Sequence, residues 1–565
     1  MIRFFRILAF STLICGPVSM TYAQGTSAKE LPKGWHLLDR SKDGFYGISL
    51  DKAYDFLKNK KSTPTIVAVI DSGIDTLHED LKEVLWTNTK EIPGNGIDDD
   101  KNGYIDDVHG WNFIGGKDGR NVKDDSYEGA RVYHKLKKVF GGTSFDTSNM
   151  DAAKRAQYQM WLKAKMNIEG EAATGGVDVT LLQGVLRRSL HADSALRTAI
   201  GKDAYTGNEL DKYSPASPEL TKSKAELLYM FKANNMMEIT NKEFLEGLGD
   251  YVNGELKKKQ AASTAPADLR AEIVKDNEAD INDRFYGNND IMAGTPFHGT
   301  HVSGIIGAKR ANGKGIDGIA DNVRIMMVRA VPDGDEHDKD IALAIRYAVD
   351  NGAKVINMSF GKSFSPEKEW VDDAVKYADS KGVLLVHAAG NDASNVDSTD
   401  NFPNANLKNM TERAGNWITV GASSDPLAEP GFKSLTASFS NYGKKEVDVF
   451  APGTKIYSTI PGGNTYGNAQ GTSMAAPVVA GVAGLIMSYF PALTPEQVKM
   501  IIEKSATPVT DKVKLPGSDE MVALSDISTS GGLLNAFEAV KLAAATKGDA
   551  SKQKLPASTL KNKKN

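Results

Sequence analysis

The feature that most constrains the fold of this chain is a series of short, continuous apolar runs rich in β-branched residues. The first is Thr-Ile-Val-Ala-Val-Ile at 65–70, and four more follow at 323–331, 355–358, 383–388 and 417–420. Runs that do not alternate with polar residues are typical of parallel strands buried on both faces. Helical patterns at 340–349 and 367–380 lie between them. This alternation predicts an α/β fold with a parallel sheet, whose functional groups gather at the carboxyl ends of the strands.

Composition excludes several classes of protein. The 565 residues are 25% charged and 41% hydrophobic, an ordinary globular balance that excludes collagen-like and wholly disordered chains. The formal net charge of −4 gives no reason to expect a nucleic-acid partner. The single cysteine, Cys15, excludes intramolecular disulfides and cysteine-only zinc sites.

The first 23 residues have the pattern of a signal peptide. Arg3 and Arg6 precede an apolar run, and the small-x-Ala pattern ends at Ala23. The run is short for a transmembrane helix, and no other candidate follows, so we expect export to the periplasm or the exterior without stable membrane insertion. Two alternatives are a short N-terminal anchor and a lipoprotein on Cys15, although the bulky Ile14 disfavours the lipoprotein.

Changes in composition divide the rest of the chain. Residues 24–60 form an N-terminal arm with a helical pattern at 50–57, and residues 61–113 and 291–545 carry the strand and helix alternation. Residues 114–290 lack it and contain long helical stretches, such as 152–168 and 223–237, so we expect a largely helical insertion. Residues 546–565 contain six lysines without periodicity, which predicts a disordered tail.

Three motifs supply a carboxylate, an imidazole and a hydroxyl: Asp71-Ser72-Gly73, a segment from His298 to Gly304, and Gly471-Thr472-Ser473-Met474-Ala475-Ala476-Pro477. Each has a simpler explanation. Asp71 could be a turn residue, His298 and His301 could share a helical face as metal ligands, and Ser473 could cap a helix. No acidic third ligand follows at zinc-protease spacing. Together the three motifs point to an acyl-transfer triad, in which a base activates serine and a carboxylate orients the base.

The order of the three groups separates classes of hydrolase. Here it is Asp, His, Ser, whereas α/β-hydrolases have Ser, Asp, His. The residues around Ser473 also lack the second glycine of the nucleophile elbow. An esterase or lipase is therefore a weak third hypothesis.

Over 61–113 and 291–545 the chain resembles the subtilisin-like serine peptidases, the subtilases. The resemblance rests on the three motifs, on His78-Glu79-Asp80-Leu81 after the first, and on Ala388-Ala389-Gly390-Asn391. It implies a three-layer α/β fold with a mostly parallel, seven-stranded sheet. It also implies endopeptidase activity, with Ser473 as nucleophile, His298 as base, Asp71 as its partner and Asn391 as a donor to the oxyanion.

The same resemblance places the peptide substrate. The segment Ser359, Phe360 and Gly361 would pair with the extended substrate backbone and form one wall of the primary pocket, and Ala388, Ala389 and Gly390 would form the other wall. The alternative for Ser359–Gly361 is an ordinary strand end and turn. Proteins and peptides are the expected partners.

An acidic loop predicts bound calcium. Residues 98–107 place oxygen side chains at the first, third, fifth and ninth positions of a calcium loop and glycine at the sixth. The expected ligands are Asp98, Asp100, Asn102, the carbonyl of Tyr104, Asp106 and Asp107. His109 stands where the loop usually ends in glutamate, so Asp107 or a residue elsewhere would complete the site. The alternative is a solvated acidic turn.

The sequence departs from a compact subtilase between Asp71 and His298, where positions 72–297 hold 226 residues. The insertion could be a lid, an exosite for protein substrates, or a spacer. We expect cleavage before Gln24, and only residues 25–64 separate Gln24 from the first strand, so we expect no separate folding prodomain. The alternative function is a catalytically retired subtilase scaffold that binds a partner through the insertion. The intact set of four catalytic groups favours the enzyme.

Overall fold

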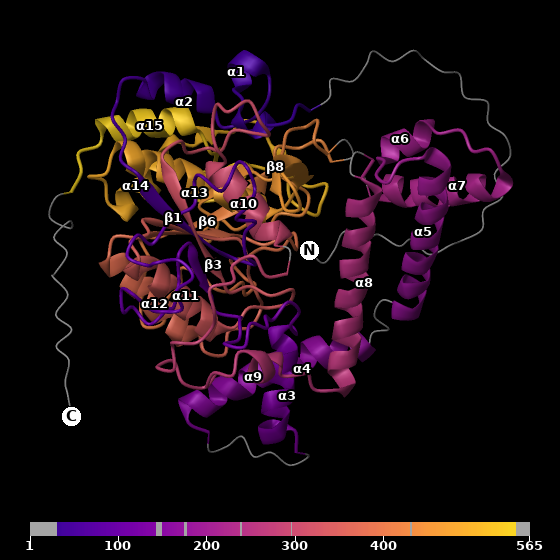
Figure 1. Cartoon of the computed structure of the whole chain (residues 1–565), viewed down its shortest axis with the longest axis horizontal. Coiled ribbons are helices and arrows are strands. Elements are labelled where there is room, and N and C mark those ends of the chain that lie inside the picture. The colour runs from indigo at the N-terminus through magenta and orange to yellow at the C-terminus, as the bar shows by residue number, and fades with distance from the viewer. Residues whose placement is uncertain are drawn as a thin grey trace. The chain divides into compact units, whose positions relative to one another are not determined.

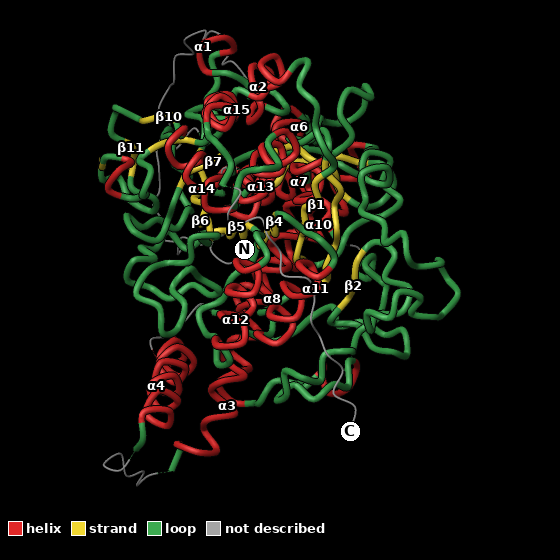
Figure 2. Tube along the Cα trace, turned by 90° about the vertical axis from the view of Figure 1, so that its left-hand side faces the viewer, coloured by secondary structure: helices red, strands yellow, loops and turns green. Residues whose placement is uncertain are grey.

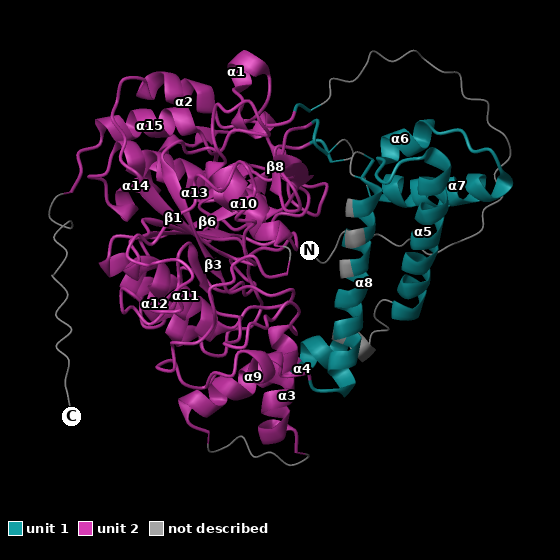
Figure 3. Cartoon of the chain, viewed as in Figure 1, with its two compact units in different colours: residues 1–32, 165–265, 427–433 teal, residues 33–164, 266–426, 434–565 magenta. Residues whose placement is uncertain are grey.

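The computed structural model describes residues 31–142, 150–173, 178–234, 236–237, 240–294, 296–429 and 432–549. The chain forms two compact units (Figure 3). The larger is built from 33–164, 266–426 and the chain after 434, and the smaller centres on 165–265. The expected signal peptide and most of the expected lysine-rich tail lie outside the described residues. The division into arm, catalytic parts and insertion stays a prediction.

A nine-stranded sheet forms the centre of the larger unit. Its order is β10-β13-β7-β6-β5-β4-β1-β3-β2, and every neighbouring pair is parallel except β10 with β13. The strands are β1 (Thr65–Asp71), β2 (Gly110–Asn112), β3 (Val323–Arg329), β4 (Val355–Met358), β5 (Leu384–Ala388), β6 (Trp417–Ser423), β7 (Val449–Pro452), β10 (Thr507–Pro508) and β13 (Gly532–Leu533). The predicted α/β fold with a mostly parallel sheet is confirmed.

The sheet differs from the expected seven strands at one edge. The seven strands β1 to β7 form a continuous parallel set. Strands β13 and β10 extend the sheet beyond β7. These two strands have two residues each, too few to give a periodic sequence signal. All five apolar runs are strands, and each is almost wholly buried, because helices cover both faces of the sheet.

Helices form a layer on each side of the sheet (Figures 1 and 2). On one side lie α10 (Phe297–Gly307), α13 (Thr472–Tyr489) and α14 (Pro495–Ser505), with α2 (Leu50–Leu57) packed on α15 (Ala536–Ala545). On the other side α11 (Asp338–Asp350) packs against α12 (Lys368–Ser380), and Ile341 and Val375 join Ile70 and Met326 in one core. The sequence predicts no membrane-span candidate after the N-terminal run, but among the described residues one helix, α13, is long and apolar enough by composition; 89% of it is buried inside the protein.

The larger unit has several smaller elements. They are η1 (Trp35–Leu37), α1 (Arg40–Asp43), α3 (Glu128–Phe140), α9 (Leu269–Ile273), the hairpin β8 (Ile456–Ile460) and β9 (Thr465–Ala469), the pair β11 (Val513–Lys514) and β12 (Met521–Val522), and η2 (Leu524–Asp526). A further helix, α4 (Ala152–Ala173), runs across the boundary between the units.

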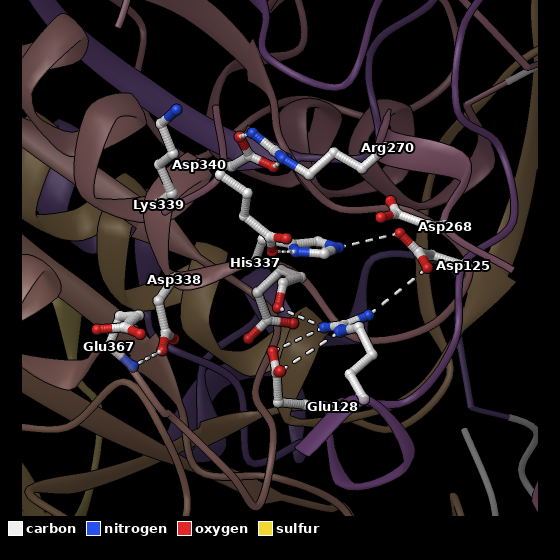
Figure 4. Close-up of polar contacts among 12 residues, drawn as sticks. Asp125, Glu128, Asp268, Arg270, His337, Asp338, Lys339, Asp340 and Glu367 are labelled. Carbon is white, nitrogen blue, oxygen red and sulfur yellow. Dashed lines mark hydrogen bonds and ion pairs between the residues drawn. The ribbon is translucent and has the colours of Figure 1, made fainter. Parts of the chain in front are cut away.

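Charged side chains are buried between α9 and α11. Arg270 bonds to both carboxylate oxygens of Asp340 (Figure 4). Its guanidinium also lies 2.9 Å from Asp276. Lys339 donates to Asp276 as well, at 2.5 Å, and the Tyr286 hydroxyl donates to Asp340 at 2.5 Å. These charges are stable in the interior because each faces an opposite charge with directed hydrogen bonds.

The smaller unit is helical and has its own core. It contains α5 (Val179–Ile200), α6 (Gly207–Lys212), α7 (Pro218–Ala233) and α8 (Asn241–Ser263). Polar caps start three of them: Asp178, the capping box of Thr206 with Glu209, and Ser217 before Pro218. Apolar residues from all four helices, including Leu182, Leu210, Phe231 and Phe244, form the core.

Candidate functional site

Asp71 and His298 are in contact at the carboxyl edge of the sheet. Asp71 is the last residue of β1 and is buried, and His298 is the second residue of α10. His298 Nδ1 lies 2.8 Å from Asp71 Oδ1 and 3.0 Å from Oδ2. Gly299 permits this approach, since a Cβ there would lie 2.1 Å from the Gly73 carbonyl oxygen and 3.1 Å from Asp71 Oδ1. The carboxylate therefore holds the imidazole with a proton on Nδ1 and leaves Nε2 for other chemistry.

The electrostatics of this pair favour a basic imidazole. Burial lowers the pKa of His298, the Asp71 carboxylate raises it, and the net result is a pKa above the ordinary value. Within the described ranges, Nε2 of His298 has no hydrogen-bond partner. Arg329, at the end of β3, fixes the turn after β1 by donating to the Ser72 carbonyl at 3.0 Å.

Ser473 lies in the first turn of α13, and it exchanges two hydrogen bonds with Ser359. Ser473 Oγ donates to the Ser359 carbonyl at 3.1 Å, and Ser359 Oγ donates to the Ser473 carbonyl at 2.9 Å. The second bond has a clear cause. Pro477 is four residues later in the helix and has no N–H, so the Ser473 carbonyl lacks its usual intrahelical donor. The Ser473 hydroxyl is not hydrogen-bonded to His298 among the contacts of the described chain.

Asn391 follows β5, and its side chain is oriented by Thr472. Asn391 Oδ1 accepts from the Thr472 backbone N–H at 2.8 Å and from its hydroxyl at 3.0 Å. This assigns the Nδ2 group to the opposite side of the amide, with no hydrogen-bond partner among the described residues. Gly390 makes the turn possible with φ +101°, where a Cβ would also meet Asn441 Nδ2 at 2.4 Å. Asn391 and the first turn of α13 thus place free N–H donors beside Ser473.

The sequence profile of the subtilase family, Peptidase_S8, matches residues 62–524. The chain belongs to the subtilase family. Among curated relatives of this subtilase, a thermophilic serine proteinase of Bacillus sp. (strain AK1) is 42% identical over 222 residues, 39% of this chain and 48% of that protein. An extracellular protease of Xanthomonas campestris pv. campestris is 36% identical over 252 residues, 41% of this chain and 40% of that protein. Thermitase of Thermoactinomyces vulgaris is 36% identical over 275 residues, 47% of this chain and 85% of that protein. The subtilase thus spans less than half the length of the first two relatives.

The six residues expected to contact substrate lie on two neighbouring segments, the one that follows β4 and the one that ends β5 and leads to Asn391. Ser359 touches Ser473 directly, and the Gly390 N–H donates to Thr472 Oγ1 at 3.0 Å. Asn401 lies between the two expected walls: its Nδ2 donates to the Ala389 carbonyl at 2.9 Å, and its Oδ1 would lie 2.6 Å from a Cβ on Gly361. Phe360 follows β4 by two residues, and Ala388 is the last residue of β5, the strand that pairs with β4. Their role in binding stays a prediction.

The acidic loop gathers a different set of oxygens from the one expected for calcium. Glu91, Asp98 and Asp100 each place a carboxylate oxygen within 4.8 Å of the others. Asp106 instead accepts from the backbone N–H groups of Gly94 and Gly96, both at 2.8 Å. The three clustered carboxylates are hard oxygen donors of the type that calcium prefers, so the residues present fit that ion.

Hydrogen bonds within the protein reach most of the acidic loop: Asp98 and Glu91 also accept from backbone N–H groups, at 2.8–3.1 Å. Asn102 Nδ2 donates to Asp107 at 3.1 Å, and the Tyr347 hydroxyl donates to Asp107 at 2.7 Å. Burial raises the pKa of Asp107 to about 6. The side chain of Tyr104 packs among aromatic rings, including Trp111 and Tyr347. As calcium ligands, Asn102, Tyr104, Asp106 and Asp107 stay predictions.

Sequence reasoning missed five side chains, four near the candidate catalytic residues and one, Glu91, in the acidic cluster. They are Ser359 through its hydroxyl, Thr472, Arg329, Glu91 and His387. His387 received no role from the sequence, but its Nε2 lies 2.8 Å from the Phe360 carbonyl, and burial lowers its pKa to about 4. A charged residue ending a buried strand was the available signal for Arg329, whereas Glu91 lies outside the loop pattern.

Proposed function

We propose that this subtilase is an exported serine endopeptidase that hydrolyses peptide bonds through an acyl-enzyme intermediate on Ser473. The observation that carries the proposal is the His298–Asp71 pair, at 2.8 Å and 3.0 Å, with His298 on helix α10, which packs against α13, whose first turn contains Ser473. The names of relatives such as thermitase and the extracellular protease support proteolysis and export.

The proposed mechanism begins with a rotation of the Ser473 side chain. Its hydroxyl must exchange the Ser359 carbonyl for His298 Nε2, a rotamer change that side chains make within nanoseconds when they are accessible. His298 then takes the hydroxyl proton as Ser473 Oγ attacks the scissile carbonyl. Asp71 keeps the other ring proton on Nδ1 and stabilises the imidazolium.

The oxyanion of the tetrahedral intermediate would be bound by two donors. These are Asn391 Nδ2 and the Ser473 backbone N–H in the first turn of α13, where the helix dipole also favours negative charge. The intermediate collapses when His298 gives its proton to the leaving amine. Water, deprotonated by the same imidazole, then hydrolyses the acyl-enzyme and restores Ser473.

Calcium is part of the proposal. We assign it to Glu91, Asp98 and Asp100, with further oxygens from the same loop. Bound calcium would offset the repulsion among these carboxylates and stabilise the fold, and it would take no part in the reaction.

A fluorophosphonate probe tests the central claim, because it labels a serine only when base and oxyanion donors are in place. We expect wild-type protein at neutral pH to be labelled and to cleave a peptide library, and Ser473→Ala to do neither. If folded wild-type protein takes no label and leaves the library intact, the chain is instead a retired scaffold, and a binding role becomes the better explanation.

A further inference from the structure

The segment that touches Ser473 is held at almost every residue. Ser359 exchanges two hydrogen bonds with Ser473, and the Phe360 carbonyl lies 2.8 Å from His387 Nε2. Lys362 pairs with Phe402 through both backbone groups, at 3.0 Å and 2.8 Å. Residues 359–362 therefore form a fixed edge beside the nucleophile.

The side chain of Lys362 is a buried cation between the N-termini of two helices. Its Nζ lies 2.9 Å from Glu128 Oε2, 2.8 Å from Asp338 Oδ1 and 2.7 Å from the Glu336 carbonyl, and the side chain is 2% exposed. Glu128 is the first residue of α3 and Asp338 the first of α11. Burial lowers the pKa of Lys362, the two carboxylates raise it, and the net pKa is above the ordinary value. The ammonium therefore stays charged and binds three acceptors in fixed directions.

Two of the acceptors of Lys362 also bond to a second cation, Arg131. Arg131 donates to Glu128 at 2.7 Å and to the Glu336 carbonyl at 3.2 Å. His337 Nε2 lies 3.0 Å from Asp125 (Figure 4), and its Nδ1 lies 2.5 Å from Glu278. Arg131 and His337 thereby join the loop before α11 to the start of α3 in addition to Lys362.

We propose that Lys362 is a positioning residue, which fixes the edge 359–361 against α3 and α11 so that an extended peptide can bind beside Ser473. This inference rests on the proposed function. An apolar side chain of similar size could fill the same volume without the cost of burying a charge. A lysine with three directed bonds adds a fixed backbone position, and misplacing a binding edge by about 1 Å can cost about 10²-fold in rate.

The role of Lys362 predicts a difference between long and short substrates. A peptide p-nitroanilide with at least four residues before the scissile bond needs the edge 359–361, whereas a single-residue p-nitrophenyl ester needs only the triad and the oxyanion donors. For Lys362→Met we expect kcat/KM on the peptide to fall about 10- to 100-fold, mainly through KM. The ester and the fluorophosphonate labelling rate should change less than about threefold.

Two further variants separate positioning from general stability. Lys362→Arg keeps the charge and should recover most of the peptide activity. Lys368→Met is the matched control. Lys368 is the first residue of α12, and its Nζ donates to the Asp372 carboxylate at 2.6 Å and to the Asn406 carbonyl at 2.7 Å. Unlike Lys362, its side chain is partly exposed. We expect Lys368→Met to leave both activities unchanged. If Lys362→Met does not fold, Glu128→Gln replaces it, because Gln removes the negative charge that Lys362 faces while its amide oxygen can still accept from Arg131, and a selective loss in the same direction is expected.

The inference is overturned if ester and peptide activities fall by equal factors, or if the peptide is cleaved as well as by wild type. A wild-type protein that takes no fluorophosphonate label refutes the proposed function instead. The two failures are therefore distinguishable.

Discussion

The amide of Asn391 has two separable tasks, and two substitutions distinguish them. Its oxygen accepts from the N–H and hydroxyl of Thr472, and its Nδ2 is the proposed donor to the oxyanion. Asn391→Asp keeps the acceptor oxygen and the shape but replaces the donor with a second oxygen. Asn391→Ala removes both. A comparison of the two variants therefore measures donation apart from the positioning of α13.

The expected magnitudes differ for activity and for stability. In subtilisin, a member of the same family, loss of one such donor costs about 10²–10³ in kcat, or about 3–4 kcal/mol, and we use that scale for both variants. For Asn391→Asp the added negative charge beside the oxyanion should bring the loss to the upper end. Thr472 is fully buried, so Asn391→Ala also leaves two of its donors unpaired, at about 1–3 kcal/mol of folding stability for each donor that water does not reach.

The assay is steady-state hydrolysis of a peptide p-nitroanilide, together with thermal unfolding. Both variants should lose kcat with little change in KM, and only Asn391→Ala should lose stability. If Asn391→Asp retained kcat within tenfold of wild type while Asn391→Ala did not, the donor role would be wrong. Asn391 would then act only by holding Thr472.

Four further predictions concern His298, the acidic loop and Gly299. The raised pKa of His298 means that its neutral, basic form appears at higher pH, so kcat/KM should rise through an inflection above 6.5; an inflection below 6.5 would contradict the influence of Asp71. The same shift makes the His298–Asp71 pair stabilising below pH 6.5, and this contribution is lost as pH rises through the folded-state pKa. Chelation of calcium should lower the melting temperature of wild type but not that of Asp98→Asn. Where calcium is at about 100 times its Kd, the loss for wild type corresponds to about 2.7 kcal/mol of unfolding free energy. Equal responses of the two proteins would exclude Asp98 as a ligand. Gly299→Ala should displace α10 from β1 and abolish the low-field proton NMR signal of the His298–Asp71 hydrogen bond, and an unchanged signal would refute the close-approach argument.

The sheet could be predicted from sequence because its strands are buried on both faces. The runs at 65–70 and 355–358 have the continuous apolar pattern that this environment requires, and both are strands within a residue of the prediction. Strands β10 and β13 have two residues each and form only because the chain after α14 returns to the edge at β7. No local pattern records that kind of pairing.

The sequence motifs of the candidate site could be predicted, but the hydrogen-bond partners that position its residues could not. His298 and Ser473 lie in long, specific motifs, whereas the hydroxyl that serves the Ser473 carbonyl comes from Ser359, 114 residues away. Pro477 shows in the sequence that a donor is missing, but only tertiary packing decides which group replaces it. Charged residues are also read from sequence as solvent-exposed, so Lys362 and Glu128 gave no sign of being a buried pair.

The buried ions limit which segments of this subtilase can be deleted. A deletion of 114–290 as one block would remove Glu128 and Arg270, so that Asp340 would lose its ion-pair partner inside the protein and Lys362 would keep only one of its two carboxylates, Asp338. Loss of one partner of a buried pair costs about 3–5 kcal/mol, a large share of the stability of most domains. A shortened version should therefore be cut within 165–265 and should keep the flanking stretches that carry these charges.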